Sequence, residues 1–166
     1  MVFLFVLSYP FLLEMLALHH ITPPDKKYWS HAALIFTTVY AVFVAANYAV
    51  QLATIIPMIL SGAASKISIL VQTPHSLFGD FDAIGYISLA IATLLAISVF
   101  EKHGYQKWIR ISYTPVTPLI AFVYFYPDFS DNLLLSGLPW TITAPLAMLL
   151  LAIMFKKISN KKIIYR

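Results

Sequence analysis

The stretch VYAVFVAANYAVQLAT, residues 39–54, decides the fold, because it is mostly apolar and yet carries two amide side chains, Asn47 and Gln51. It lies within an apolar segment, residues 29–56, that can cross a bilayer as one helix, for which about 20 residues suffice. An amide in hydrocarbon is costly unless it is hydrogen-bonded. Asn47 and Gln51 therefore need partners, either within the protein or in a ligand.

The composition of the whole chain is that of a membrane protein. Of its 166 residues, 60% are hydrophobic and 11% are charged, and the mean hydropathy is +0.81. A soluble domain carries about 25% charged residues, so the composition excludes a soluble enzyme. The chain contains no cysteine that could form a disulfide or a thiolate metal site. Its opening residues show neither the basic region nor the cleavage site of a signal peptide, so we expect none.

Five apolar segments of the chain have the length of a transmembrane helix. Ser30 is the expected N-cap of the second segment. Pro115 and Pro118 disturb the fourth segment, although membrane bundles tolerate such kinks. The sequence therefore predicts a single domain, an all-α, polytopic bundle of five spans, at residues 1–20, 29–56, 83–100, 108–126 and 137–156.

The basic residues indicate the orientation of these spans. Ten of the 11 lysines and arginines fall on one side of the five-span arrangement, and only Lys66 falls on the other. Loops rich in lysine and arginine face the cytoplasm, so we expect the N terminus outside and the C terminus inside the plasma membrane. The net charge of +4 therefore indicates orientation and no nucleic-acid partner. The basic tail, residues 157–166, should face anionic lipid.

The segment 61–82 is too interrupted by polar residues to span a membrane, and we expect it to lie on the outer interface. Within it, TPHSLFGDFD is expected to form a turn leading into the third helix. Turn and N-cap chemistry accounts for Ser76, Asp80 and Asp82. His75 lies beside these acids, but sequence alone shows no convergent catalytic geometry, and no catalytic residue is assigned.

Polar side chains share one face of the second predicted helix. At 100° per residue, Tyr40, Asn47, Tyr48 and Gln51 fall within an arc of about 100°. Such a face either packs against other helices through hydrogen bonds or lines a ligand or ion site. We expect Asn47, nearer the bilayer centre, to bond within the protein, with Ser8 or Tyr9 as a partner. Gln51 should meet water or ligand, because it lies one turn nearer the surface.

Glu14 is the only acid inside a predicted span. An ionisable residue at that depth is a candidate functional group by default. One interpretation is a neutral acid that donates a hydrogen bond to Tyr40 or to a backbone carbonyl. The other is a carboxylate that handles a proton or binds a cation. Four histidines lie near the cytoplasmic ends of the first three predicted helices: His19, His20, His31 and His103. Their spacing is not that of a metal site, so we expect no metal and no cofactor.

Two runs of residues resemble those of a group of small multi-pass bacterial membrane proteins, which carry an Asn-Tyr-x-x-Gln-Leu run and a later Pro-His-x-x-Phe…Gly-Tyr run. The resemblance covers most of the chain and implies a multi-pass helical fold without a particular activity. The matching positions are Asn47, Tyr48, Gln51, Leu52, Pro74, His75, Phe78, Gly85 and Tyr86.

These observations favour a non-enzymatic protein that binds or passes a small ligand, with possible proton coupling left open. The predicted patch inside the bundle consists of Glu14, Tyr40, Asn47, Tyr48 and Gln51. An accessory or scaffold subunit of a membrane complex is the alternative, and a membrane-embedded enzyme acting on lipid is the third interpretation. A homo-oligomer or a partner subunit is compatible with each of them.

Overall fold

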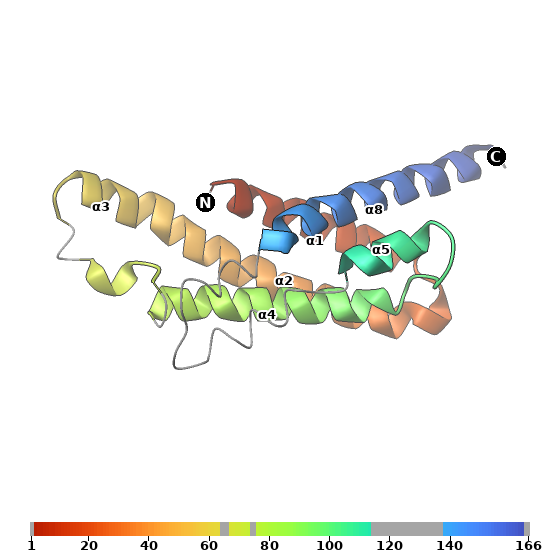
Figure 1. The fold of residues 1–166 in the computed structure, drawn as a ribbon, viewed down its shortest axis with the longest axis horizontal. Helices are drawn as coiled ribbons and strands as arrows, with labels where there is room; N and C mark the ends of the chain where they lie inside the picture. The colour runs from red at the N-terminus through yellow and green to blue at the C-terminus, as the bar shows by residue number, and fades with distance from the viewer. Residues whose placement is uncertain (1, 64–66, 74–75, 114–137, 165–166) are drawn as a thin grey trace.

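The computed structural model describes residues 2–63, 67–73, 76–113 and 138–164. Within these ranges every regular element is a helix, so the chain belongs to the all-α class as predicted (Figure 1). The first helix, α1 (Val2–Ile21), covers the predicted segment 1–20. The last helix, α8 (Leu138–Ile164), runs further into the basic tail than the predicted segment 137–156.

The second apolar segment forms one long helical stretch. It consists of η1 (Pro24–Lys26), α2 (Lys27–Val50), η2 (Gln51–Ile55) and α3 (Ile56–Leu60). Because α2 already begins at Lys27, Ser30 lies inside its first turns, and the prediction that Ser30 is the N-cap is wrong. Ser30 is buried there, and its hydroxyl donates to the carbonyl oxygen of Lys27 at 3.0 Å.

The element η2 is a single π-helical turn within this stretch and ends two residues before Pro57. In a regular α-helix the ring of Pro57 would clash with the carbonyl of Ala53 and leave that carbonyl without a donor. A widened turn relieves this contact, and π turns are often found at functional sites. The N–H of Gln51, at the start of η2, points to the carbonyl oxygens of both Asn47 and Tyr48.

The third apolar segment is helical from an earlier residue than expected. The helix α4 (Leu77–Ile97) begins directly after Ser76, whose hydroxyl oxygen accepts a hydrogen bond of 3.1 Å from the N–H of Gly79. Ser76 is therefore the N-cap, as predicted, but Asp80 and Asp82 belong to the helix and not to a turn before it. Asp80 lies in the first turn of α4, where an acid suits the helix N-terminus, whereas Asp82 lies in the second turn, so the assignment of Asp82 to turn or N-cap chemistry is wrong. A short helix, η4 (Ser68–Leu70), lies within the predicted interfacial segment.

The predicted fourth span lies mostly outside the described residues. Its beginning belongs to α5 (Gln106–Tyr113). The described part of this segment reaches residue 113, so neither Pro115 nor Pro118 can be placed.

The helices α2 and α4 lie side by side and antiparallel, α1 packs against the half of α2 nearer its N-terminus, and α8 packs against α5 and α1 (Figure 1). Gly85 permits the close approach of α2 and α4. A Cβ atom at Gly85 would lie 3.1 Å from Cγ2 of Val44, tighter than ordinary van der Waals contact. Further along α4, the small residues Ala92 and Ala96 are fully buried. Small residues at helix contacts are typical of membrane bundles.

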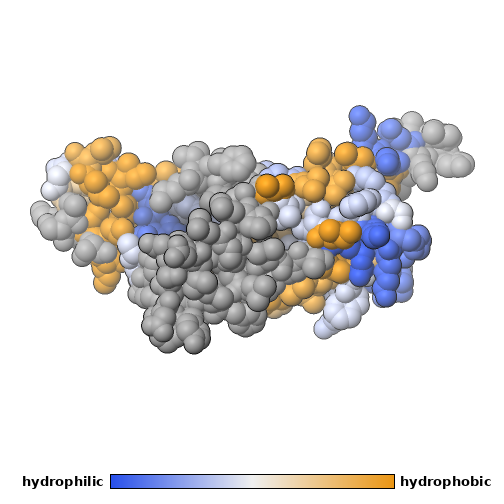
Figure 2. All heavy atoms as spheres, in the orientation of Figure 1, coloured by the Kyte–Doolittle hydropathy of each residue, from blue (hydrophilic) through white to orange (hydrophobic). Residues whose placement is uncertain are grey.

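Two helical stretches of the described residues are long and apolar enough to cross a membrane: Pro24–Leu60 and Leu77–Ile97. Large apolar side chains remain exposed on both of them, among them Ile35, Val42 and Leu94. Hydrophilic residues gather instead at the end of the molecule that carries the C terminus, on the right of Figure 2.

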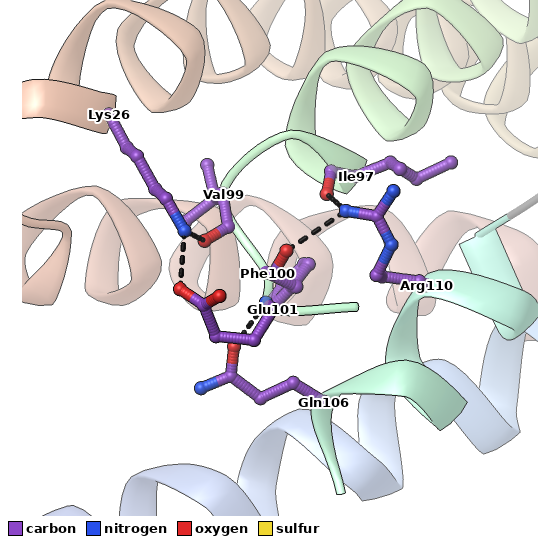
Figure 3. A network of polar contacts seen from close by, with 7 residues as sticks. All are labelled: Lys26, Ile97, Val99, Phe100, Glu101, Gln106 and Arg110. Atoms are coloured by element: carbon purple, nitrogen blue, oxygen red, sulfur yellow. Dashed lines mark hydrogen bonds and ion pairs between the residues drawn. The ribbon is translucent and has the colours of Figure 1, made fainter. Parts of the chain in front are cut away.

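This charged end ties three helices together (Figure 3). Lys26, before α2, forms an ion pair of 2.6 Å with Glu101, and its ammonium also donates to the carbonyl oxygen of Val99 at 3.2 Å. Arg110 of α5 donates to two carbonyl oxygens at the end of α4. These are the oxygen of Ile97, the last residue of α4, at 2.6 Å, and that of Phe100, just after it, at 2.9 Å. Cations at the C-terminal end of a helix satisfy its free carbonyls and its dipole.

Candidate functional site

A partly buried carboxyl group, that of Asp82, lies where the end of α2 meets the start of α4. The side-chain amide of Asn47 donates to Oδ1 of Asp82 at 3.0 Å, and the side chain of Gln72 also hydrogen-bonds to this carboxyl group. Asn47 is fully buried, with an exposed fraction of 0%. Three segments distant in sequence therefore meet at Asp82: the last turn of α2, the connection after η4, and the second turn of α4.

Two oxygen atoms beside this carboxyl group lack hydrogen-bond donors. Oδ1 of Asn47 and Oε1 of Gln72 are buried, and neither has a partner among the described residues. Most buried polar atoms in proteins are paired, so each of these oxygens calls for an explanation. Both amides direct their N–H groups at Asp82, which leaves their oxygens as free acceptors next to an acid.

Gln51 closes the site from the direction of η4. Its Nε2 donates to the carbonyl oxygen of Leu70 at 2.8 Å, and its exposed fraction is 3%. The prediction that Gln51 meets water or ligand is therefore wrong, because the connection between α3 and α4 folds back over it. By holding Leu70, Gln51 fixes the backbone two residues before Gln72.

Three tyrosines surround the other side of the carboxyl group. The hydroxyl groups of Tyr48 and Tyr86 hydrogen-bond to each other. Both side chains also interact electrostatically with the carboxyl group of Asp82. Tyr40 interacts with the same carboxyl group, and its ring centroid lies 6.1 Å from that of Tyr86. Tyr40 also packs edge-on against Phe11 of α1, with 6.1 Å between the ring centroids. We call this group the Asp82 site; it consists of Tyr40, Asn47, Tyr48, Gln72, Asp82 and Tyr86.

No lysine, arginine or histidine of the described residues pairs with Asp82. The ion pair that the described residues do form, Lys26 with Glu101, lies at the opposite end of α2. The Asp82 site thus combines one acid with surplus acceptor oxygens in an apolar surrounding. It suits a partner that brings positive charge or hydrogen-bond donors.

The structure separates Glu14 from the other residues of the predicted patch. Tyr40 and Tyr48 interact electrostatically with Asp82, whereas the carboxyl group of Glu14 interacts electrostatically with Tyr113 of α5. Oε2 of Glu14 is buried and has no hydrogen-bond partner among the described residues. The expected bond from Glu14 to Tyr40 is therefore wrong. Tyr40, Asn47 and Tyr48 belong to the Asp82 site and Gln51 lies next to it, while Glu14 lies outside it.

The expected partner of Asn47 was also wrong. Asn47 does bond within the protein, as predicted, but to Asp82 and not to Ser8 or Tyr9. Sequence reasoning missed Asp82 because it placed this residue in a turn. A signal was present: with Ser76 as the N-cap, Asp82 and Tyr86 are four residues apart on one helix and therefore share a face.

The histidines lie at the charged end of the molecule. Nδ1 of His19 and the hydroxyl oxygen of Ser30 are 2.9 Å apart, and the rings of His19 and His31 are 5.4 Å apart. Within the described ranges, no group of three histidine or acidic side chains could hold a metal ion. His75 falls outside these ranges.

Within the described residues, the fold is all-helical, two helices are long and apolar enough to cross a membrane, and the Asp82 site lies between them. Comparison with known proteins adds no family: no family model, no curated protein and no solved structure matches the chain.

Proposed function

We propose that this chain is a five-span protein of the plasma membrane that binds or passes a small ligand at the Asp82 site. The observation that carries the proposal is the partly buried carboxyl group of Asp82, flanked by the buried amide oxygens of Asn47 and Gln72, which have no partner among the described residues. Helix packing alone would be served by amides whose donors and acceptors are both paired. Buried acceptor oxygens without donors beside an acid support the view that a further group completes the site.

The distribution of charge supports the five-span arrangement. Basic side chains from three parts of the chain, the start of α2, α5 and α8, meet at one end of the bundle. Lys26 and Arg110 bond to the end of α4, Lys27 donates to the carbonyl oxygen of His19 at 2.6 Å, and Lys157 lies 4.5 Å above the ring of Tyr105. Under the positive-inside rule this end is cytoplasmic, which puts the Asp82 site in the outer half of the membrane.

Cysteine labelling tests the topology, since the chain has no native cysteine. Ser61, just after α3, and Asn160, near the end of α8, are both exposed and lie at opposite ends of the bundle. In intact cells a membrane-impermeant maleimide should label Ser61→Cys and should reach Asn160→Cys only after permeabilisation. Labelling of both positions from one side would contradict the five-span topology.

Thermal unfolding tests the ligand site. The purified protein in detergent would be heated with a panel of defined small solutes: sodium, potassium and choline chloride, glycine and glucose. At least one of them should raise the Tm of the wild type in a saturable manner, and Asp82→Asn should lose this response. The matched control is Ser88→Ala, which removes a buried hydroxyl of α4 that donates to the carbonyl oxygen of Ile84 within the same helix. A panel without any Asp82-dependent response would contradict the proposal.

A second candidate function is an accessory subunit, and the position of α3 favours it. This helix projects away from α1 and α8 (Figure 1), and Ile56, Ile59 and Leu60 are exposed on it. Cross-linking from a photoreactive residue at Leu60 in native membranes would capture a stoichiometric partner under this candidate function. Cross-links to lipid alone would contradict it.

A further inference from the structure

We infer that the Asp82 site binds a monovalent metal cation, and we commit to Na⁺, with oxygen ligands from Asp82, Asn47 and Gln72. The inference rests on the proposed function, because it names the ligand of the same site. Its first support is a count of donors and acceptors. The N–H groups of both amides are directed at Asp82, while Oδ1 of Asn47 and Oε1 of Gln72 have no donor among the described residues.

A single cation satisfies all of these acceptors at once. Asp82, when ionised, would be a negative charge between two helices without a basic partner among the described residues, and such a charge is costly in an apolar surrounding. A proton on Asp82 would supply one donor, which can pair with only one of the two free oxygens. A metal ion attracts several oxygens together and also neutralises the carboxylate.

The type of ligand atom decides the class of ion. Carboxylate and amide oxygens are hard ligands that suit alkali and alkaline-earth ions, and the site offers neither a thiolate nor, within the described residues, an imidazole. Divalent ions are usually held by several carboxylates, and affinity rises with their number. With one carboxylate, the Asp82 site balances one positive charge, so a monovalent ion fits it.

The local backbone also favours a cation. The π turn η2 begins at Gln51, one helical turn after Asn47, and interrupts the regular helix beside the Asp82 site. Interrupted helices at membrane sites are known to present carbonyl oxygens to Na⁺. Gln51 acts here as a positioning residue: its bond of 2.8 Å to Leu70 fixes the connection that carries Gln72.

Thermal unfolding in sodium chloride, with choline chloride replacing it at constant ionic strength, tests the inference. The wild type should gain Tm in a saturable manner as Na⁺ replaces choline. Gln72→Leu and Asp82→Asn should each weaken the apparent affinity for Na⁺ by at least about tenfold, as removal of a metal ligand or its support does. The control Ser88→Ala should respond like the wild type.

Two further measurements guard against variants that fail to fold. Isothermal titration of the wild type with sodium chloride needs no variant, and it should show saturable heat that choline chloride does not produce. Gln72→Glu keeps an oxygen ligand and adds a second carboxylate, so it should retain cation binding and gain a response to Ca²⁺. A residue with a merely structural role would not change the preferred ion.

The outcomes separate this inference from the proposed function. Suppose that glycine or glucose stabilises the protein in a manner that depends on Asp82, while Na⁺ has no effect. This result would refute the inference of a Na⁺ site but would support the proposed ligand-binding function. A Tm that depends on pH but not on the Na⁺ concentration would also refute the Na⁺ site and would indicate that a proton completes the site. An Asp82→Asn variant that binds Na⁺ like the wild type would refute the inference, and the absence of any solute response would refute both.

Discussion

The side-chain amide of Asn47 donates to Oδ1 of Asp82 at 3.0 Å, which joins the end of α2 to the start of α4 across 35 residues of sequence. This bond connects the two helices at the end opposite the Lys26–Glu101 ion pair. The antiparallel pair of helices is therefore held by polar contacts at both ends and by apolar packing between them.

A double-mutant cycle measures this bond. Asn47→Leu should lower the free energy of unfolding by about 2 kcal/mol, because it removes a partly buried hydrogen bond to a group that carries charge when ionised. Asn47→Leu combined with Asp82→Leu should cost less than the sum of the two single changes, by about 1 kcal/mol, as for residues in direct contact. Unfolding in detergent by steric trapping or heat gives the values.

Gln51→Leu serves as the comparison for that cycle. It breaks a bond to a neutral carbonyl oxygen, that of Leu70, so we expect a smaller loss of about 1 kcal/mol. Additive effects of Asn47→Leu and Asp82→Leu would show that the two side chains do not act as a pair.

Gly85→Ala should destabilise the contact between α2 and α4. The added Cβ would lie 3.1 Å from Cγ2 of Val44 and 3.5 Å from Cβ of Phe43, so the helices would have to move apart. We expect a loss of about 1–2 kcal/mol in the free energy of unfolding, typical of overpacking. Thermal unfolding of the purified variant measures the loss.

Val44→Ala provides the rescue test for Gly85. By itself it leaves a small void and costs about 1 kcal/mol. In combination with Gly85→Ala it removes the crowding methyl groups, so the double variant should be more stable than additivity predicts. A double variant whose losses simply add would indicate that the close approach at Gly85 does not depend on Val44.

Glu14→Gln should leave most of the stability in place. Oε2 of Glu14 has no hydrogen-bond partner among the described residues, and the amide has nearly the same shape. We expect a change of less than about 1 kcal/mol in the free energy of unfolding. Any solute response of the Asp82 site should also persist, because Glu14 lies beside Tyr113 and not beside Asp82. Loss of that response would show that the two acids act together.

Glu101→Gln should make stability depend less on acid pH. The Lys26 ammonium, 2.6 Å away, holds the pKa of the Glu101 carboxyl below its usual value of 4.5. A carboxyl group with a lowered pKa stabilises the folded state above its usual pKa, and that contribution is lost as the pH falls through the lowered value. The Tm of Glu101→Gln should therefore lie slightly below that of the wild type at pH 7, and the difference should vanish in stronger acid.

The exposed Lys102 provides the control for Glu101, because Lys102→Gln removes a charge from the same loop without breaking the ion pair. It should leave the pH dependence of the Tm unchanged. An equal pH dependence in the wild type and in Glu101→Gln would show that the ion pair does not contribute to stability.

Much of the fold could be predicted from local properties of the chain. The apolar segments predicted helices where α1, α2 and α8 are found, because hydropathy and helical length are properties of contiguous residues. The rotation of 100° per residue also put Tyr40, Asn47, Tyr48 and Gln51 on one face, and all four are buried. The clustering of basic residues between apolar segments anticipated the charged end.

The partners of these residues depended on tertiary structure. Asn47 bonds to Asp82 only because Ser76 caps α4 earlier than hydropathy suggested and because Gly85 lets α4 approach α2. Gln51 is buried only because the connection through Leu70 folds back over η2. A side-chain periodicity states which face is polar, but the distance between two helices and the path of the loop between them arise from contacts between residues far apart in the chain. For that reason only the folded structure brings Asp82 into the site and leaves Glu14 outside it.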